Sequence, residues 1–203
     1  KKNYFLKLLQ QLNYPIAAPS ANPFNSISPT KAEHVANYFK EELKMVLNGG
    51  SCSKGIESTI VGFEENEPII YRLGAISVEE IESVVGEVKL LTQQENKPLA
   101  PGMLKKHYSP KTKLILTNNI SSKLKNHENE KVGIISFCTS HKLNKNQQEI
   151  ILWTSRDLNE AAENLYNAMH ILDTFNLEFI IAERMPEFGL GKSMNDRLER
   201  ASR

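Results

Sequence analysis

The alternation of apolar runs and amphipathic segments after residue 112 is the feature that most restricts the fold. Apolar runs occupy 113–117, 132–137, 150–153 and 179–182, and each has the length of a typical strand. Residues 157–176 instead repeat apolar side chains every three or four positions, as an amphipathic helix does, with Asp157 and Glu160 at its start. The pattern predicts a small Rossmann-like α/β/α domain. It contains no GxGxxG sequence, so no dinucleotide site is predicted.

The first 91 residues predict a second α/β unit made of shorter elements. An amphipathic helix is expected at 1–13, a helix after Pro29 with a Thr30/Glu33 capping box, and a helix that Ser77 and Glu80 cap and Gly86 ends. Glu65–Glu67 is predicted to be a hairpin tip. The predicted strands, or strand ends, are Pro15–Ala18, Met45–Leu47, Ile60–Val61, Pro68–Arg72 and Val88–Leu91.

Residues 92–112 differ from both halves, because they hold three prolines and show no periodicity. They predict a linker, although the segment also carries Met103, Leu104, His107 and Tyr108, which are unusual residues for a passive tether. A functional lid and a plain spacer both fit this composition. The expected organisation is therefore 1–91, a linker at 92–112, and 113–203.

Composition restricts the class of protein. A formal net charge of +1 provides no field for nucleic acid or an anionic membrane, and no apolar run has the length of a membrane helix. Cys52 and Cys138 lack metal-ligand spacing, which favours a reduced cytoplasmic protein without structural zinc. Because the chain starts inside a helical pattern without Met, we expect a fragment of a longer protein.

Three segments carry candidate ligand contacts. Pro15–Thr30 places small residues at an expected strand end and a Ser/Thr-rich helix start beyond it, which suits phosphate, although an ordinary strand–turn–helix corner has the same composition. Arg72 ends an apolar strand, where an arginine either reaches solvent or pairs with an anion. The Gly189–Ser193 turn, with Ser193 as the expected N-cap, either binds an anion or makes a tight connection.

Five motifs occur in one order along the chain: APSAN…SPT, GIEST, YRLGAI, APGM…HYSP and GLGKSMNDRLERA. Together they resemble the long, two-domain form of the YrdC-like L-threonylcarbamoyladenylate synthase family. The resemblance implies a twisted open α/β sheet around a cleft, of which this chain holds part, a linker across that cleft, and a smaller Rossmann-like domain. It implies synthesis of threonylcarbamoyl-AMP from L-threonine, bicarbonate and ATP, with pyrophosphate released. Other proteins, threonylcarbamoyl-transferases, then modify tRNA.

The resemblance also implies roles for individual residues. Ser20, Ser28, Arg72 and Tyr108 match ATP contacts, and Ala18 and Ser58 match L-threonine contacts. His107, Asn22 and Thr59 match weaker or supporting positions, while Mg²⁺ would arrive with ATP. The family's Lys/Arg-rich catalytic segment has no counterpart here, so no catalytic residue is assigned. We expect the 203 residues alone to be inactive. We also expect them to associate through an exposed sheet edge.

The chain departs from the family pattern at Asn25, Leu73 and Lys106, where glycine, proline and arginine are usual, and none of these changes contradicts ATP binding. Three alternatives remain open. An RNA-binding module of the same fold is opposed by the near-zero charge. A carbamoyl-transfer domain is opposed by the linker motif and the absence of zinc-ligand cysteines. A regulatory remnant is the third.

Overall fold

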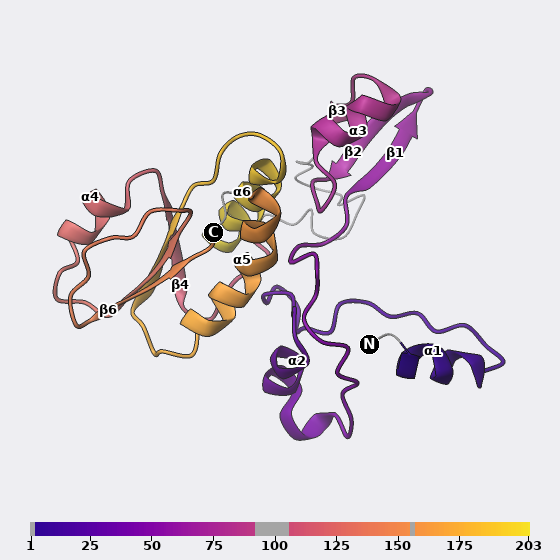
Figure 1. Ribbon diagram of the computed structural model, residues 1–203, viewed down its shortest axis with the longest axis horizontal. Coiled ribbons are helices and arrows are strands. Elements are labelled where there is room, and N and C mark those ends of the chain that lie inside the picture. The colour runs from indigo at the N-terminus through magenta and orange to yellow at the C-terminus, as the bar shows by residue number, and fades with distance from the viewer. Residues whose placement is uncertain (1–2, 92–105, 155–156) are drawn as a thin grey trace.

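The computed structural model describes residues 3–91, 106–154 and 157–203 (Figure 1). Its strands form two sheets, a three-stranded sheet with the order β1-β2-β3 and a four-stranded sheet with the order β4-β7-β5-β6. The predicted α/β class is confirmed. The predicted division at 91 and 112 stays a prediction, and most of the expected linker, including Met103 and Leu104, lies outside the described residues.

The four-stranded sheet is parallel throughout and is built from the second half of the chain. Its β7 lies between β4 and β5, so segments distant in sequence become neighbours. A parallel sheet covered on both faces requires apolar residues on both sides of each strand, which explains the continuous apolar runs. The strands are β4 (Lys113–Thr117), β5 (Val132–Ser136), β6 (Gln147–Ile151) and β7 (Phe179–Glu183).

Helices α5 (Leu158–Leu172) and α6 (Leu190–Ala201) lie together on one side of this sheet, and α4 (Ile120–Lys125) lies on the other (Figure 1). Alternate residues of a strand point to opposite faces. Accordingly, Ile135 and Ile180 join the core under α5 and α6, whereas Ile134 and Ile181 join the core under α4.

The smaller sheet is built around a β-hairpin. Strands β1 (Ile60–Glu64) and β2 (Glu67–Arg72) pair antiparallel across Glu65 and Asn66, which have φ values of 51° and 69°. Positive φ at both loop residues is the geometry that tight hairpins favour. Helix α3 (Val78–Val85) then leads to β3 (Lys89–Leu90), which pairs parallel with β2. The predicted Ser77/Glu80 capping box and the Gly86 stop are confirmed.

The remaining elements of the first half are α1 (Asn3–Gln10), α2 (Ala32–Phe39) and a 3₁₀ turn (Lys40–Glu42). The predicted strands at Pro15–Ala18 and Met45–Leu47 are wrong, since both segments are irregular. A strand is stable only with a hydrogen-bonded neighbour, and within the described ranges no strand lies beside either segment. Their apolar side chains are instead exposed, Met45 by 76%, apart from the half-buried Val46.

Two predicted helix starts are also wrong. The N-cap of α2 is Lys31, without a side-chain cap, and the N–H of Thr30 donates instead to Nδ1 of buried His34 at 3.1 Å. Helix α6 begins at Leu190 after Gly189, whose φ is 53°, so Ser193 lies inside the helix. A Cβ on Gly191 would lie 1.9 Å from the Pro186 carbonyl oxygen. The glycine-rich turn is therefore a tight connection.

The first half of the chain contacts α5 through α2. The rings of His34 and His170 stack with centroids 3.8 Å apart, and Nε2 of His170 donates to the Ser28 carbonyl at 3.2 Å. Burial is the main cause that lowers the pKa of His34 to about 4, and the neighbouring His170 and Lys31 lower it further. Burial also lowers the pKa of His170. Both rings are thus neutral at neutral pH.

This histidine stack predicts a loss of stability in mild acid. Unfolded His34 would protonate near pH 6.5, whereas the folded ring stays neutral down to about pH 4. Between these values the unfolded state binds more protons, so the free energy of unfolding falls as the pH falls, by up to about 3 kcal/mol. Urea titrations from pH 7.5 to 4 measure the slope. The His34→Gln variant, which cannot titrate, should flatten it; equal slopes in the two proteins would contradict the assignment.

Candidate functional site

The carboxylate of Glu57 connects its own segment to three others: the Ser28 segment, α5 and α6. Its Oε1 accepts a hydrogen bond from the Ser28 hydroxyl at 2.5 Å, and its Oε2 accepts from Nε of Arg197 at 3.0 Å. The Tyr166 hydroxyl donates to both oxygens, at 3.2 and 3.1 Å. Glu57 belongs to the GIEST motif, Tyr166 to α5 and Arg197 to α6. We call these four residues and Tyr108 the Glu57 cluster.

The cluster is charged although the Arg197 side chain is fully buried and the Glu57 side chain is only 17% exposed. Burial alone would raise the pKa of Glu57, but the Arg197 charge and the Ser28 hydrogen bond outweigh it and hold that pKa below its usual range. Burial opposes the charge of Arg197 as well, but neighbouring Tyr166 and Glu57 raise its pKa. Burial raises the pKa of Tyr166 far above its normal value, so its hydroxyl remains a donor. The pair is therefore ionised.

Tyr108 packs into the same cluster from the end of the expected linker. It is 1% exposed, its ring stacks on Tyr166 with centroids 5.8 Å apart, and the Arg197 guanidinium lies 5.0 Å from its ring centroid. Next to it, the N–H of Ser109 donates to the Asn25 carbonyl at 2.8 Å. Asn25 has a φ of 63°, the left-handed conformation that asparagine tolerates well. This end of the linker is thus held between the first half and α6.

Ser58 and Arg72 lie together beside the cluster. Nε and Nη2 of Arg72 donate to the Ser58 carbonyl at 3.1 and 2.9 Å, and Nη2 is 3.2 Å from the Ser58 hydroxyl. The Ala75 N–H donates to the Glu57 carbonyl at 2.9 Å. A Cβ on Gly74 would lie 2.3 Å from the Thr59 nitrogen, so only glycine allows this approach. The GIEST and RLG segments therefore form one unit.

The charge of Arg72 also reaches the linker end. Burial lowers the pKa of His107; the Glu57 charge opposes this, and the positive charges of Arg197, Arg200 and Arg72 lower the pKa further. The His107 N–H donates to the Arg200 carbonyl at 3.4 Å, which places the ring beside the last turns of α6.

Four of the six predicted contact residues therefore gather around Glu57: Ser28, Ser58, Arg72 and Tyr108. Ala18 and Ser20 are exposed, and no hydrogen bond within the described ranges joins them to the other four. The Ser28 hydroxyl is occupied by Glu57, and Tyr108 is part of the core. Their roles in ATP binding stay predictions, and in this structure both side chains serve the packing.

Sequence reasoning missed Glu57, Tyr166 and Arg197. Arg197 did carry a signal, because it lies three residues after Met194 and next to Leu198, on the apolar side of a helix. It is fully buried there. A charge at such a position requires a partner from another segment. The sequence does not reveal which of its carboxylates that partner is.

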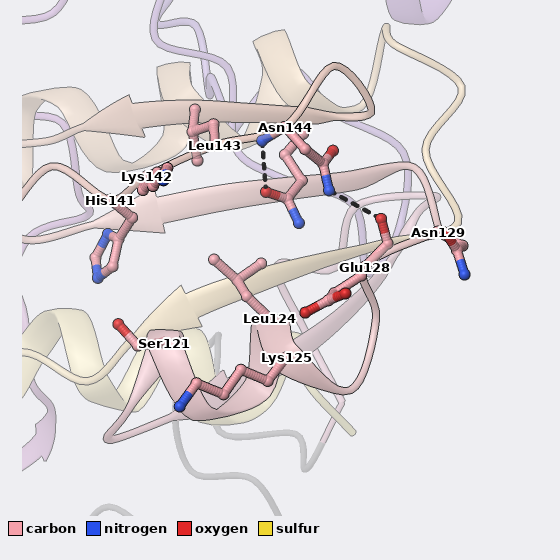
Figure 2. A pocket seen from close by; sticks show the side chains of 10 residues that line it. Ser121, Leu124, Lys125, Glu128, Asn129, His141, Lys142, Leu143 and Asn144 are labelled. Atoms are coloured by element: carbon pink, nitrogen blue, oxygen red, sulfur yellow. Dashed lines mark hydrogen bonds between the residues drawn. The ribbon is translucent and has the colours of Figure 1, made fainter.

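A separate cavity of about 500 Å³ lies in the second half, between α4 and the segment that leads into β6 (Figure 2). Figure 2 shows Ser121, Leu124 and Lys125 on the α4 side and His141 to Asn144 opposite them. Nδ1 of His141 lies 2.7 Å from the Glu149 carboxylate, which fixes the ring. None of the predicted site residues lines this cavity.

The cysteines and the acidic side chains form no further site in the described residues. Cys52 and Cys138 are exposed and form no disulfide. Across 3–91, 106–154 and 157–203, no three His, Cys, Asp or Glu side chains are arranged to hold a metal ion. In that part of the chain, no helix has both the length and the apolar character that crossing a membrane requires.

Comparison with known proteins identifies two matching family models. One, described as "Threonylcarbamoyl-AMP synthase, C-terminal domain", matches residues 76–203, more than half of the chain. The other, described as "Telomere recombination", matches residues 1–74.

The relatives agree with these matches. Threonylcarbamoyl-AMP synthases of Pyrococcus abyssi and Bacillus subtilis are 32% and 33% identical over 97% of this chain. A crystal structure of P. abyssi Sua5 complexed with L-threonine superimposes with a TM-score of 0.83 at 33% identity, again over 97% of this chain. A P. abyssi Sua5 variant in which a histidine and a tyrosine are replaced by alanine gives a TM-score of 0.81 at 30% identity, over 98% of this chain and 60% of that one.

The chain spans 60% of the length of the P. abyssi and B. subtilis relatives, and 60% of the P. abyssi structure. The order of the motifs, the α/β architecture and the family model over residues 76–203 all agree. The chain therefore belongs to the threonylcarbamoyl-AMP synthase family, as its motifs predicted.

Proposed function

We propose that the protein carrying this chain synthesises threonylcarbamoyl-AMP from L-threonine, bicarbonate and ATP. The observation that carries the proposal is the hydrogen-bonded Ser58–Arg72 pair next to the Glu57 cluster, in a chain of this family. A carboxylate oxygen of the threonine carbamate attacks the α-phosphorus of ATP, a P–O bond forms, and the bond to the leaving pyrophosphate breaks. This chemistry requires alignment and neutralisation of phosphate charge more than a covalent intermediate.

The residues divide between the two substrates. Arg72 provides the charge for the phosphates, because its guanidinium offers donors in a planar fork. Ser58 and Ala18 serve L-threonine, and Ser20, Ser28 and Tyr108 serve ATP. Since Ser28 and Tyr108 are engaged in the Glu57 cluster, their contact with nucleotide requires the linker end to move away from α6. Mg²⁺ accompanies ATP as part of that substrate.

The wider context follows from the product. Threonylcarbamoyl-AMP is a mixed anhydride that water hydrolyses, so it passes to threonylcarbamoyl-transferase proteins that modify tRNA, and we place this sequence of reactions in the cytoplasm. The related P. abyssi Sua5 forms a complex with L-threonine, which supports threonine as the amino-acid substrate.

Replacement of Arg72 tests the proposal. In the full-length protein, Arg72→Gln should lower threonine-dependent release of pyrophosphate about 10- to 100-fold. The reason is that each hydrogen bond to a charged group contributes roughly 1.5–3 kcal/mol to the interaction with the phosphates. Arg203→Gln, at an exposed position, removes the same charge elsewhere and should leave the rate unchanged.

Pyrophosphate release with and without L-threonine and bicarbonate measures both points. If the unaltered protein releases no pyrophosphate in response to threonine, the proposed function is wrong. If Arg72→Gln keeps the full rate, the function stands but the role of Arg72 is wrong.

A further inference from the structure

Helix α6 contacts both segments that carry the Ser58–Arg72 pair. We propose that Arg197 and Ser193 of α6 are positioning residues for the synthase reaction, which hold the GIEST and RLG segments so that Ser58 and Arg72 face their substrates. The inference rests on the proposed function and gives the second half of the chain a part in it. Neither side chain is proposed to touch substrate.

The first contact acts through Glu57. Arg197 fixes the Glu57 side chain at 3.0 Å, and the Glu57 carbonyl accepts the Ala75 N–H at 2.9 Å. Glu57 directly precedes Ser58. Its carboxylate and its backbone are thus held at the same time, from α6 and from the RLG segment, and the direction of the chain entering Ser58 is determined.

The second contact acts through Gly74. The Ser193 hydroxyl donates to the Gly74 carbonyl at 2.9 Å, and both residues are buried. Gly74 lies two residues after Arg72. Further out, Nζ of Lys192 pairs with the Glu79 carboxylate at 2.8 Å. Three side chains of one helix therefore contact the chain on either side of the Ser58–Arg72 pair.

Helix α6 is itself fixed to the parallel sheet. The Asn195 amide accepts from the Met185 N–H at 2.8 Å and donates to the Met185 carbonyl at 2.9 Å, just beyond β7. Because the buried Asn195 amide bonds to both backbone groups of Met185, α6 has little freedom to rotate relative to the sheet. The rigidity of the four-stranded sheet is therefore transmitted through α6 to Glu57 and Gly74.

The chemistry of Arg197 favours positioning over simple cohesion. A buried ion pair adds little net stability, since the desolvation of two charges offsets their attraction, and apolar residues of similar volume serve as well. The ion pair instead fixes the orientation of the Glu57 carboxylate, because that carboxylate also accepts hydrogen bonds from Ser28 and Tyr166. Among the residues that the structure describes, Nη2 of Arg197 is buried without a hydrogen-bond partner, a cost that an apolar residue would avoid.

The experiment separates positioning from stability. In the full-length protein, Arg197→Met should lower kcat/KM for L-threonine about 10- to 100-fold and lower Tm, because it leaves the largely buried Glu57 carboxylate without its positive partner. Adding Glu57→Gln removes that charge and should restore much of the Tm, while kcat/KM for threonine stays low. Arg184→Met breaks an ion pair between α6 and the β7 end without contacting either segment, and should leave kcat/KM unchanged.

A second readout does not depend on activity. Hydrogen exchange at the Ala75 amide, which is bonded to the Glu57 carbonyl, should become faster in Arg197→Met and in the double variant, but not in Arg184→Met. If the double variant recovers kcat/KM together with Tm, Arg197 has a purely structural role and the inference is overturned. If the unaltered protein shows no threonine-dependent reaction, the proposed function fails, and unchanged Ala75 exchange would then overturn the positioning role separately.

Discussion

The ion pair between Glu57 and Arg197 is the interaction on which the assembly of the chain depends. The two residues are 140 positions apart in sequence, and each remains charged because the other lies beside it. A single buried charge here would be costly, so neither half can adopt its observed packing unless the other supplies the partner. The GIEST segment can therefore pack on α6 only in the arrangement that brings the Glu57 carboxylate to the Arg197 guanidinium.

The first half needs this docking because its own core is small. The three-stranded sheet and α3 bury Ile70, Val78 and Val88, with Leu73 and Ile81 packed against them. Three strands and one helix with so few buried side chains have little stability of their own. The four-stranded sheet, by contrast, has a core on each face. In Figure 1, α5 and α6 lie between that sheet and the first-half elements. These two helices therefore provide the surface against which the first half packs.

Features that depend on contacts between residues close together in sequence were predicted more reliably than features that depend on distant residues. The Ser77/Glu80 capping box and the hairpin turn at Glu65 and Asn66 depend on residues close together in the chain, and both are confirmed, although Glu67 of the expected tip belongs to β2. The strands expected at 15–18 and 45–47 depend on a partner strand, and both were wrong. Ser193 looked like a cap, but α6 begins earlier, and the Ser193 hydroxyl bonds to the Gly74 carbonyl, which only the fold brings near. Thr30 failed for a local reason, because its N–H bonds to His34 four residues on.

The same reasoning explains which site residues could be predicted. Motifs identified Ser58 and Arg72, whereas Arg197 appeared only as a charge on the apolar side of α6, and its partner was invisible in sequence. An apolar residue at 197 would fill the space equally well but would leave the docked segment free to rotate. A carboxylate held by three donors from two helices and the Ser28 loop has one orientation. Because Ser58 follows Glu57 directly, the orientation of that carboxylate also determines where the Ser58–Arg72 pair faces.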